Sequence, residues 1–232
     1  MESTINFILF GLYPYVCFAV FVIGSWARFD KDQMSWRAGS SQLLRRKQLM
    51  WGSVLFHFGI LVIFLGHFVG LLTPVQAFES MGISHAAKQM MAMVVGGLAG
   101  LACLAGLTLL LHRRLFDSRI RKTSSFWDIA ILLLLYAQLL LGMASIAVSA
   151  QHLNGEEMLR FMAWAQGIVT FQPAVANFIE GAHLIFKLHL FLGMTLFLVF
   201  PFTRLVHAIS APIWYLGRRG YQIVRTKAGL QG

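Results

Sequence analysis

Residues Leu49 to Leu72 read LMWGSVLFHFGILVIFLGHFVGLL. This stretch contains no charged residue, yet it holds two histidines, His57 and His67. An uncharged run of about 20 residues is long enough to cross the hydrocarbon core of a bilayer as a helix. The run also lacks the apolar–polar alternation that a membrane strand would need. The stretch therefore predicts a membrane-spanning helix that carries ionisable side chains.

Four other segments of the chain have the same uncharged, apolar character. Of the 232 residues, 58% are hydrophobic and 12% are charged, whereas a soluble domain usually has about 25% charged residues. This composition excludes an ordinary soluble enzyme, a disordered chain and a disulfide-stabilised scaffold. We expect an all-α membrane bundle in one domain, residues 1–232, with five transmembrane helices at about 4–25, 49–72, 90–111, 129–148 and 181–209. We also expect a short interfacial helix at 156–169, with Trp164 at headgroup depth.

The positive charges are distributed unevenly over the loops. Of the 19 Lys and Arg residues, only Lys88, Arg160 and Lys187 fall in the loops after the second and fourth spans or at their borders. The positive-inside rule therefore predicts an outside N-terminus and a cytoplasmic C-terminus. The net charge of +10 is then a topology signal, and it does not indicate a nucleic-acid partner. Because Glu2 stands where a signal peptide has basic residues, the first span is expected to be retained.

Four histidines lie on the second and fifth spans: His57, His67, His189 and His207. Ionisable side chains inside a bilayer are costly and usually functional. The two spans run in opposite directions, so His57 and His207 lie toward the cytoplasm while His67 and His189 lie toward the outside. Two imidazoles at each depth fit the axial ligands of two b-type haems better than structural zinc. The chain has no Cys-x-x-Cys-His motif, which excludes covalent c-type haem.

The helix rises of the two spans do not match. His57 and His67 are ten residues apart, or about 15 Å, while His189 and His207 are eighteen residues apart, or about 27 Å. We expect Pro201 to kink the fifth span and to absorb part of this difference. His183 is a rival ligand, but six residues before His189 it faces another side of the helix. Gly59, Gly66 and Gly70 share one face of the second span, which suits either a flat macrocycle or close helix packing.

Several longer motifs resemble a known family. They are the Tyr13-Pro14-Tyr15 turn and five stretches: GSWARFDKDQMSWRAGSSQLLRRK at 24–47, LFHFGILVIFLGHFVGLLTP at 55–74, KQMMAM at 88–93, SAQHLNGEEM at 149–158 and KLHLFLGMTLFLVFPFTRLVH at 187–207. Together they resemble the gamma subunit of bacterial respiratory nitrate reductase, over nearly the whole chain. The tail after Arg225 resembles that family less.

The resemblance implies a multi-pass protein of the bacterial inner membrane with two bis-histidine b-type haems. His57 and His207 would ligate the haem nearer the cytoplasm, and His67 and His189 the outer one. The subunit would oxidise quinol near the periplasm, releasing protons outside. Electrons would pass to an iron–sulfur beta subunit and then to a molybdenum alpha subunit, which reduces nitrate in anaerobic respiration or nitrate assimilation. The chain itself would be an electron-transfer subunit with lipid around it.

Two surfaces follow from position together with this resemblance. Lys88 opens the third span on the outer side, where its ammonium could hydrogen-bond a quinol oxygen, although such a lysine can also simply anchor a helix end. Gly66 would leave room for the quinol ring. The basic loop 28–47, including Arg45 and Arg46, and the C-terminal tail are expected to dock the iron–sulfur subunit.

Two other functions stay open at this point. One is the cytochrome b subunit of another redox complex, such as a hydrogenase, a formate dehydrogenase or a sulfur-metabolism enzyme, although the loop motifs disfavour it. The other is a proton-coupled transporter whose histidines relay protons. Transporters usually have internal repeats and broken helices, and the sequence contains no repeat.

Overall fold

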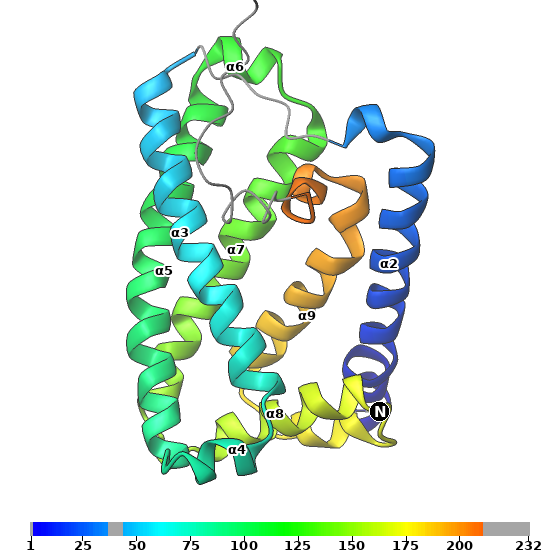
Figure 1. Cartoon of the computed structure of the whole chain (residues 1–232), viewed down its shortest axis with the longest axis vertical. Coiled ribbons are helices and arrows are strands. Elements are labelled where there is room, and N and C mark those ends of the chain that lie inside the picture. Colours follow the sequence, from blue (N-terminus) through cyan, green and yellow to red (C-terminus); the bar gives the residue numbers. More distant parts are fainter. Residues whose placement is uncertain (1, 37–43, 211–232) are drawn as a thin grey trace, which may run out of the picture.

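The computed structural model describes residues 2–36 and 44–210 and contains helices but no strand within those ranges (Figure 1). Five of its helical stretches are long and apolar enough to cross a membrane: Thr4–Lys31, Arg46–Leu72, His85–Phe116, Phe126–Ser149 and Leu184–Phe202. The predicted all-α class and the five spans are thus confirmed; the first four extend several residues beyond the expected bounds at the basic loops, whereas the fifth is shorter than expected. Which side of the membrane each end faces stays a prediction.

The elements follow one another along the chain as α1 (Glu2–Asn6), the π-helix η1 (Phe7–Leu12), α2 (Tyr13–Lys31), η2 (Gln33–Ser35), α3 (Arg46–Leu72), α4 (Val75–Ser80), α5 (His85–Phe116), α6 (Ser118–Lys122), α7 (Phe126–Ser149), α8 (Glu156–Val169), η3 (Val175–Ile179), α9 (Leu184–Val199), η4 (Phe200–Phe202) and η5 (Arg204–Ala208). Side-chain caps start three of the spans: Ser84 accepts from the backbone of Ala87 before α5, Ser125 forms a capping box with Asp128 at α7, and His183 accepts from the backbone of Ile185 before α9.

Helices α3 and α5 lie side by side and form the closest pair in the bundle (Figure 1). Glycines make this approach possible. A Cβ on Gly59 would lie 2.6 Å from the carbonyl oxygen of Ala99, and one on Gly52 would lie 3.0 Å from the Leu110 side chain. Small residues allow membrane helices to approach through their backbones. The alternative of close packing is therefore correct for Gly59.

The fifth span is broken rather than kinked. The α-helix ends at Val199, and two 3₁₀ segments, η4 and η5, carry the chain on to Ala208. Pro201 accounts for the break because it has no backbone N–H and its ring clashes with the preceding turn of a helix. The expected continuous helix over 181–209 is therefore too long at both ends, since Gly181 adopts a φ of +78° and α9 begins only at Leu184. His207 lies on the short 3₁₀ helix η5 and not on an α-helix.

Helix α8 lies across the end of the bundle that also holds α4 and the N-terminus (Figure 1). It spans Glu156–Val169, as predicted. Trp164, however, is buried, and its Nε1 donates to the carbonyl of Phe10 at 2.8 Å. The indole therefore anchors α8 to η1, while its depth relative to the headgroups stays a prediction. Gln166 donates to the carbonyls of Leu71 and Thr73, and so caps the C-terminal end of α3.

Candidate functional site

The four histidines of the second and fifth spans meet as two facing pairs. The ring centroids of His57 on α3 and His207 on η5 are 6.2 Å apart, with an angle of 71° between the ring planes. Those of His67 on α3 and His189 on α9 are 6.1 Å apart, with an angle of 43°. The structure therefore brings together the pairs expected from two antiparallel spans.

Three of these imidazoles are oriented by a backbone carbonyl in the preceding helical turn. Nδ1 lies 2.8 Å from the Ser53 carbonyl in His57, 2.8 Å from the Ile63 carbonyl in His67 and 2.5 Å from the Arg204 carbonyl in His207. A carbonyl can only accept, so Nδ1 carries the proton in each ring. The lone pair of Nε2 is then available to a metal, which is the usual arrangement of a metal-binding histidine and its hydrogen-bonded carbonyl.

His189 is held differently, by helix α7. The amide nitrogen of Gln138 lies 3.1 Å from the His189 carbonyl and 3.4 Å from its Nε2. Gly142, one turn further along α7, lets the imidazole approach the helix closely, because a Cβ there would be 3.0 Å from the ring. Nδ1 of His189 and Oε1 of Gln138 are both buried and have no hydrogen-bond partner among the described residues. Because neither atom is held by a hydrogen bond, the His189 imidazole can give up its contact with Gln138 when it binds another group.

The pair geometry fits a metal held between two imidazoles. Imidazole nitrogens bind a metal at about 2 Å, so two rings on opposite sides of one metal have centroids roughly 6 Å apart. Among the described residues, no group of three or more His, Cys, Asp or Glu side chains converges on one point. Each pair thus supplies two ligands and no more, which suits a metal whose other ligands come from a porphyrin.

The space beside the pairs also fits a large flat group. His57 and His67 are exposed on the surface of α3 in the chain alone. Cβ atoms built on Gly66 and Gly70 would meet no atom of residues 2–36 or 44–210 within 4 Å. Helix α3 packs mainly on α5, whereas α9 packs on α2 and α7, so the two histidine-bearing segments face each other without close packing. Gly66 and Gly70 therefore differ from Gly59, although the sequence places all three on one face.

The other histidines form no such pair. His183, the rival ligand, precedes α9, where its Nδ1 accepts from the backbone of Ile185 at 3.3 Å. His112 lies beside Gln48, and its ring packs at a tilt of 30° against Phe116. His85 forms an ion-pair contact of 3.3 Å with Glu79 when protonated. These three histidines make contacts that are ordinary for side chains at helix ends and in loops.

Lys88 is buried at the α8 end of the bundle, with 5% of its surface exposed. Its Nζ donates to the Gly70 carbonyl and to the Met162 sulfur, each at 2.7 Å, and lies 3.8 Å from the centre of the Phe78 ring. Neighbouring Gln89 donates to the carbonyls of Ser149 and His152, which close α7. Lys88 thus points inward, so the simple picture of a lysine that reaches out to anchor the helix end is wrong.

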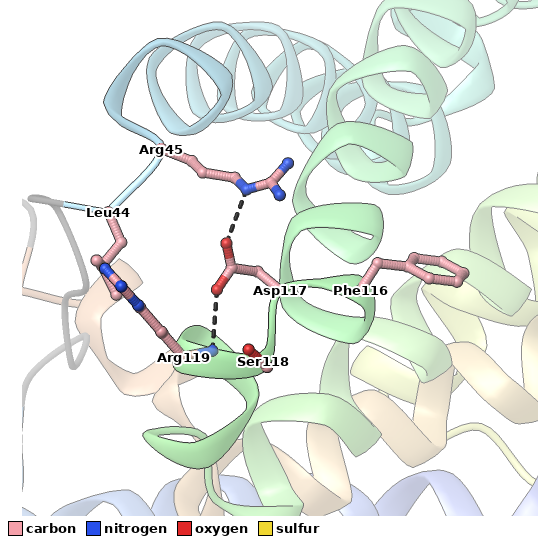
Figure 2. A pocket seen from close by; sticks show the side chains of 6 residues that line it. All are labelled: Leu44, Arg45, Phe116, Asp117, Ser118 and Arg119. Carbon is pink, nitrogen blue, oxygen red and sulfur yellow. Dashed lines mark hydrogen bonds and ion pairs between the residues drawn. The ribbon is translucent and has the colours of Figure 1, made fainter.

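The opposite end of the bundle is basic and carries a shallow surface hollow between the start of α3 and the end of α5 (Figure 2). Its lining residues are Leu44, Arg45, Phe116, Asp117, Ser118 and Arg119. Arg45 contacts Asp117 at 2.7 Å. The backbone N–H of Ile120 and the Arg45 side chain lower the pKa of Asp117 below its usual value.

The docking surface expected from the sequence, which is the loop 28–47 and the C-terminal tail, divides into three parts. Arg46 and Lys47 are exposed at the start of α3. Arg28, in contrast, is half-buried and hydrogen-bonds the carbonyls of Pro201 and Thr203. Arg37 and the C-terminal tail lie outside the described residues. Sequence reasoning missed the inward roles of Arg28, Gln138 and Asp128; a lone glutamine in an uncharged span was the clearest available signal.

Comparison with known proteins gives one consistent result. Residues 6–227 match the nitrate reductase gamma subunit family. The chain is 51% identical over 96% of its length to the respiratory nitrate reductase 1 gamma chain of Escherichia coli K12, of which 98% is covered. It is 49% identical over 98% of its length to the nitrate reductase 2 gamma chain of that organism, all of which is covered. Against the nitrate reductase gamma chain of Bacillus subtilis 168 the identity is 41%, over 95% of this chain and 98% of that one. The chain therefore belongs to the nitrate reductase gamma subunit family.

Proposed function

We propose that this chain is the membrane cytochrome b subunit of a respiratory nitrate reductase, that it binds two b-type haems, and that it oxidises quinol. The observation that carries the proposal is the pair of histidine contacts, His57 with His207 and His67 with His189, at 6.2 and 6.1 Å between ring centroids. Family membership supports it independently. It also disfavours a hydrogenase or formate dehydrogenase subunit and a proton-coupled transporter, the two functions that the sequence leaves open.

The orientation of the chain follows from its charges. The basic end holds Arg45, Arg46 and Lys47 at the start of α3 and the arginines of α6, so it faces the cytoplasm by the positive-inside rule. The end with α8 then faces the periplasm, and the membrane is the bacterial inner membrane. In this orientation His57 and His207 are the inner pair, and His67 and His189 are the outer pair.

Two haems bound at these pairs would supply one-electron carriers between quinol outside and an acceptor inside. The chain itself contributes the imidazoles and their orientation. The Ser53, Ile63 and Arg204 carbonyls keep the proton on Nδ1, so Nε2 of His57, His67 and His207 can bind iron. In this scheme electrons leave at the basic end for the iron–sulfur beta subunit and reach the molybdenum alpha subunit, where nitrate is reduced.

The quinol site of this proposal lies beside the outer pair. Lys88 Nζ binds the carbonyl of Gly70, three residues after His67 on α3. Its other two neighbours, the Met162 thioether and the Phe78 ring, are weak partners for an ammonium. A quinol oxygen can replace one of them as a stronger acceptor. Gly66 leaves open space nearby, and protons released at this end enter the periplasm.

The basic end is the proposed docking surface for the iron–sulfur subunit. Arg46 and Lys47 are exposed there and are not engaged in the ion pairs found in the described residues. The arginines and lysine of α6, Arg119, Arg121 and Lys122, follow closely on the Arg45–Asp117 contact. Such a surface suits an acidic partner and anionic lipid headgroups alike.

The test is to purify the chain from membranes in mild detergent with whatever chains accompany it. The proposal expects a dithionite-reduced spectrum of b-type haem, co-purifying iron–sulfur and molybdenum subunits, and haem reduction by a quinol analogue. A preparation without haem absorbance would contradict the cytochrome assignment. A preparation with haem that no quinol reduces would contradict quinol oxidation alone.

A further inference from the structure

His207 reaches its partner from a short 3₁₀ helix rather than from an α-helix. After α9 ends at Val199, the chain passes through η4 and η5, and His207 is the fourth residue of η5. The ring is oriented by its own turn, because Nδ1 lies 2.5 Å from the Arg204 carbonyl. A short 3₁₀ segment has poorer hydrogen-bond geometry than an α-helix. Whatever fixes the turn 201–204 therefore fixes the imidazole.

Arg28 holds this turn from one side. Its Nη1 donates to the carbonyls of Pro201 at 2.7 Å and Thr203 at 2.8 Å. Its Nη2 donates to the Ser35 carbonyl at 2.9 Å, and its Nε donates to the Ser35 hydroxyl at 3.3 Å. The planar guanidinium thus joins the end of α2, η2 and the turn in one set of bonds. A lysine has a compact ammonium and cannot reproduce this fork.

Helix α2 is shaped to bring Arg28 to the turn. A Cβ on Gly24, one turn before Arg28, would lie 2.8 Å from the Pro201 ring. The aromatic ring of Phe21 packs edge-on against Phe200, with centroids 4.9 Å apart. The close approach at Gly24 and this aromatic contact align α2 with the break in the fifth span.

Asp128 holds the turn from the other side. Nε and Nη2 of Arg204 contact Oδ1 of Asp128 at 2.8 and 2.6 Å, while Nη1 of Arg114 lies 3.5 Å from Oδ2. The capping box with Ser125 fixes the Asp128 carboxylate at the first turn of α7. The residue whose side chain is held by Asp128 is also the residue whose carbonyl orients His207.

We propose that Arg28 and Asp128 are positioning residues for the inner haem, acting through the turn 201–204 and the imidazole of His207. The inference rests on the proposed function, in which His207 binds haem iron. Arg28 donates to carbonyls on one side of the turn, and Asp128 binds the Arg204 side chain on the other. Groups that orient a metal-binding histidine typically change metal affinity by about 10–100-fold when they are removed.

The experiment compares three variants in the complete purified complex: Arg28→Lys, Arg28→Met and Asp128→Asn. Trp26→Phe is the matched control, because Trp26 is an exposed side chain on α2, two residues before Arg28 and outside the basic loop 28–47. The readouts are the low-spin electron paramagnetic resonance signals of the two haems and the rate of haem transfer to an excess of a haem-scavenging apoprotein. Arg28→Lys preserves the positive charge, so it tests the forked geometry of the guanidinium alone. For the same reason it should disturb folding less than Arg28→Met.

The proposal expects an altered signal for the inner haem only, and inner-haem loss about tenfold faster than in the parent protein. The outer-haem signal in all three variants, and both haem signals in Trp26→Phe, should match the parent. Unchanged inner-haem signals in all three variants would overturn the proposal. Equal loss of both haems would also overturn it, because that result would indicate a general role in folding. A parent complex without haem would instead overturn the proposed function itself.

Discussion

The imidazoles of His57 and His207 face each other at 6.2 Å between ring centroids, although one lies within a 27-residue helix and the other in a 3₁₀ turn. A continuous fifth helix would separate His189 from His207 by about 27 Å, against about 15 Å between their partners on α3. The break at Pro201 removes this mismatch because the chain no longer advances as a regular helix there. The pairing therefore depends on the break as much as on the helices.

Lys88→Ala tests the proposed quinol site. The variant removes the ammonium next to Gly70 and Met162 and should slow haem reduction by a quinol analogue at least about tenfold, because hydrogen bonds of charged groups contribute about 1.5–3 kcal/mol. Dithionite should still reduce both haems fully. Stopped-flow spectroscopy measures both reactions. Lys187→Ala, a second lysine near the same end, serves as the control, and quinol-driven rates near the parent value in Lys88→Ala would refute the role of Lys88.

Gly66→Leu tests whether the open space beside His67 is used. Nothing lies within 4 Å of a Cβ at Gly66 or at Gly96, so leucine at either position should leave the fold and thermal stability nearly unchanged. If haem or quinol fills the space near Gly66, only Gly66→Leu should weaken quinol-driven reduction or disturb the outer haem spectrum. Identical spectra and quinol kinetics in the two variants would place the bound groups elsewhere.

Sequence patterns predict the spans well because an apolar run must be long enough to cross the bilayer wherever its neighbours lie. The histidine pairs could also be predicted, since antiparallel helices place residues at matching depths. The different surroundings of Gly59 and Gly66 could not be predicted. They lie on one face of the helix, but Gly59 meets the backbone of α5 while Gly66 meets open space among the described residues, and this difference arises from tertiary packing rather than from the local sequence.

The surroundings of single polar residues could not be predicted from the sequence either. Lys88 looks like a helix-end lysine until Met162 on α8 and Gly70 on α3 are brought to its ammonium. Arg28 looks like one more cation of a basic loop, yet its partners lie 173 and 175 residues away. Such partners come from tertiary packing, and local sequence patterns do not encode them.

Arg46→Glu combined with Lys47→Glu tests the docking surface. Both residues are exposed at the basic end, so charge reversal should release the iron–sulfur and molybdenum subunits while both haems remain. Arg45→Glu, in contrast, also places two carboxylates together at Asp117 and should cost stability. Membrane fractionation with immunoblotting measures attachment. Full attachment of the soluble subunits in the double variant at moderate salt would refute this docking surface.

Asp117→Asn tests the contact of Arg45 with Asp117. The folded pKa of Asp117 is lowered by the Ile120 N–H and by Arg45, so its carboxylate stabilises the fold at neutral pH, and this contribution disappears as pH falls through that lowered pKa. The variant should melt slightly below the parent at pH 7, and the difference should shrink at acid pH. Asp30→Asn, which alters an exposed carboxylate on α2, is the control. A melting difference that grows on acidification would contradict the account.

The most direct test of the account is the haem content of single histidine variants. His57→Ala and His207→Ala should each lose the same haem, and His67→Ala and His189→Ala should each lose the other, because a six-coordinate haem needs both imidazoles. Haem extraction and redox-titrated visible spectra of the purified complex should give about half of the parent haem in every variant. The two variants of a pair should lack the absorbance of the same haem. Loss of spectroscopically different haems in His57→Ala and His207→Ala would contradict the pairing.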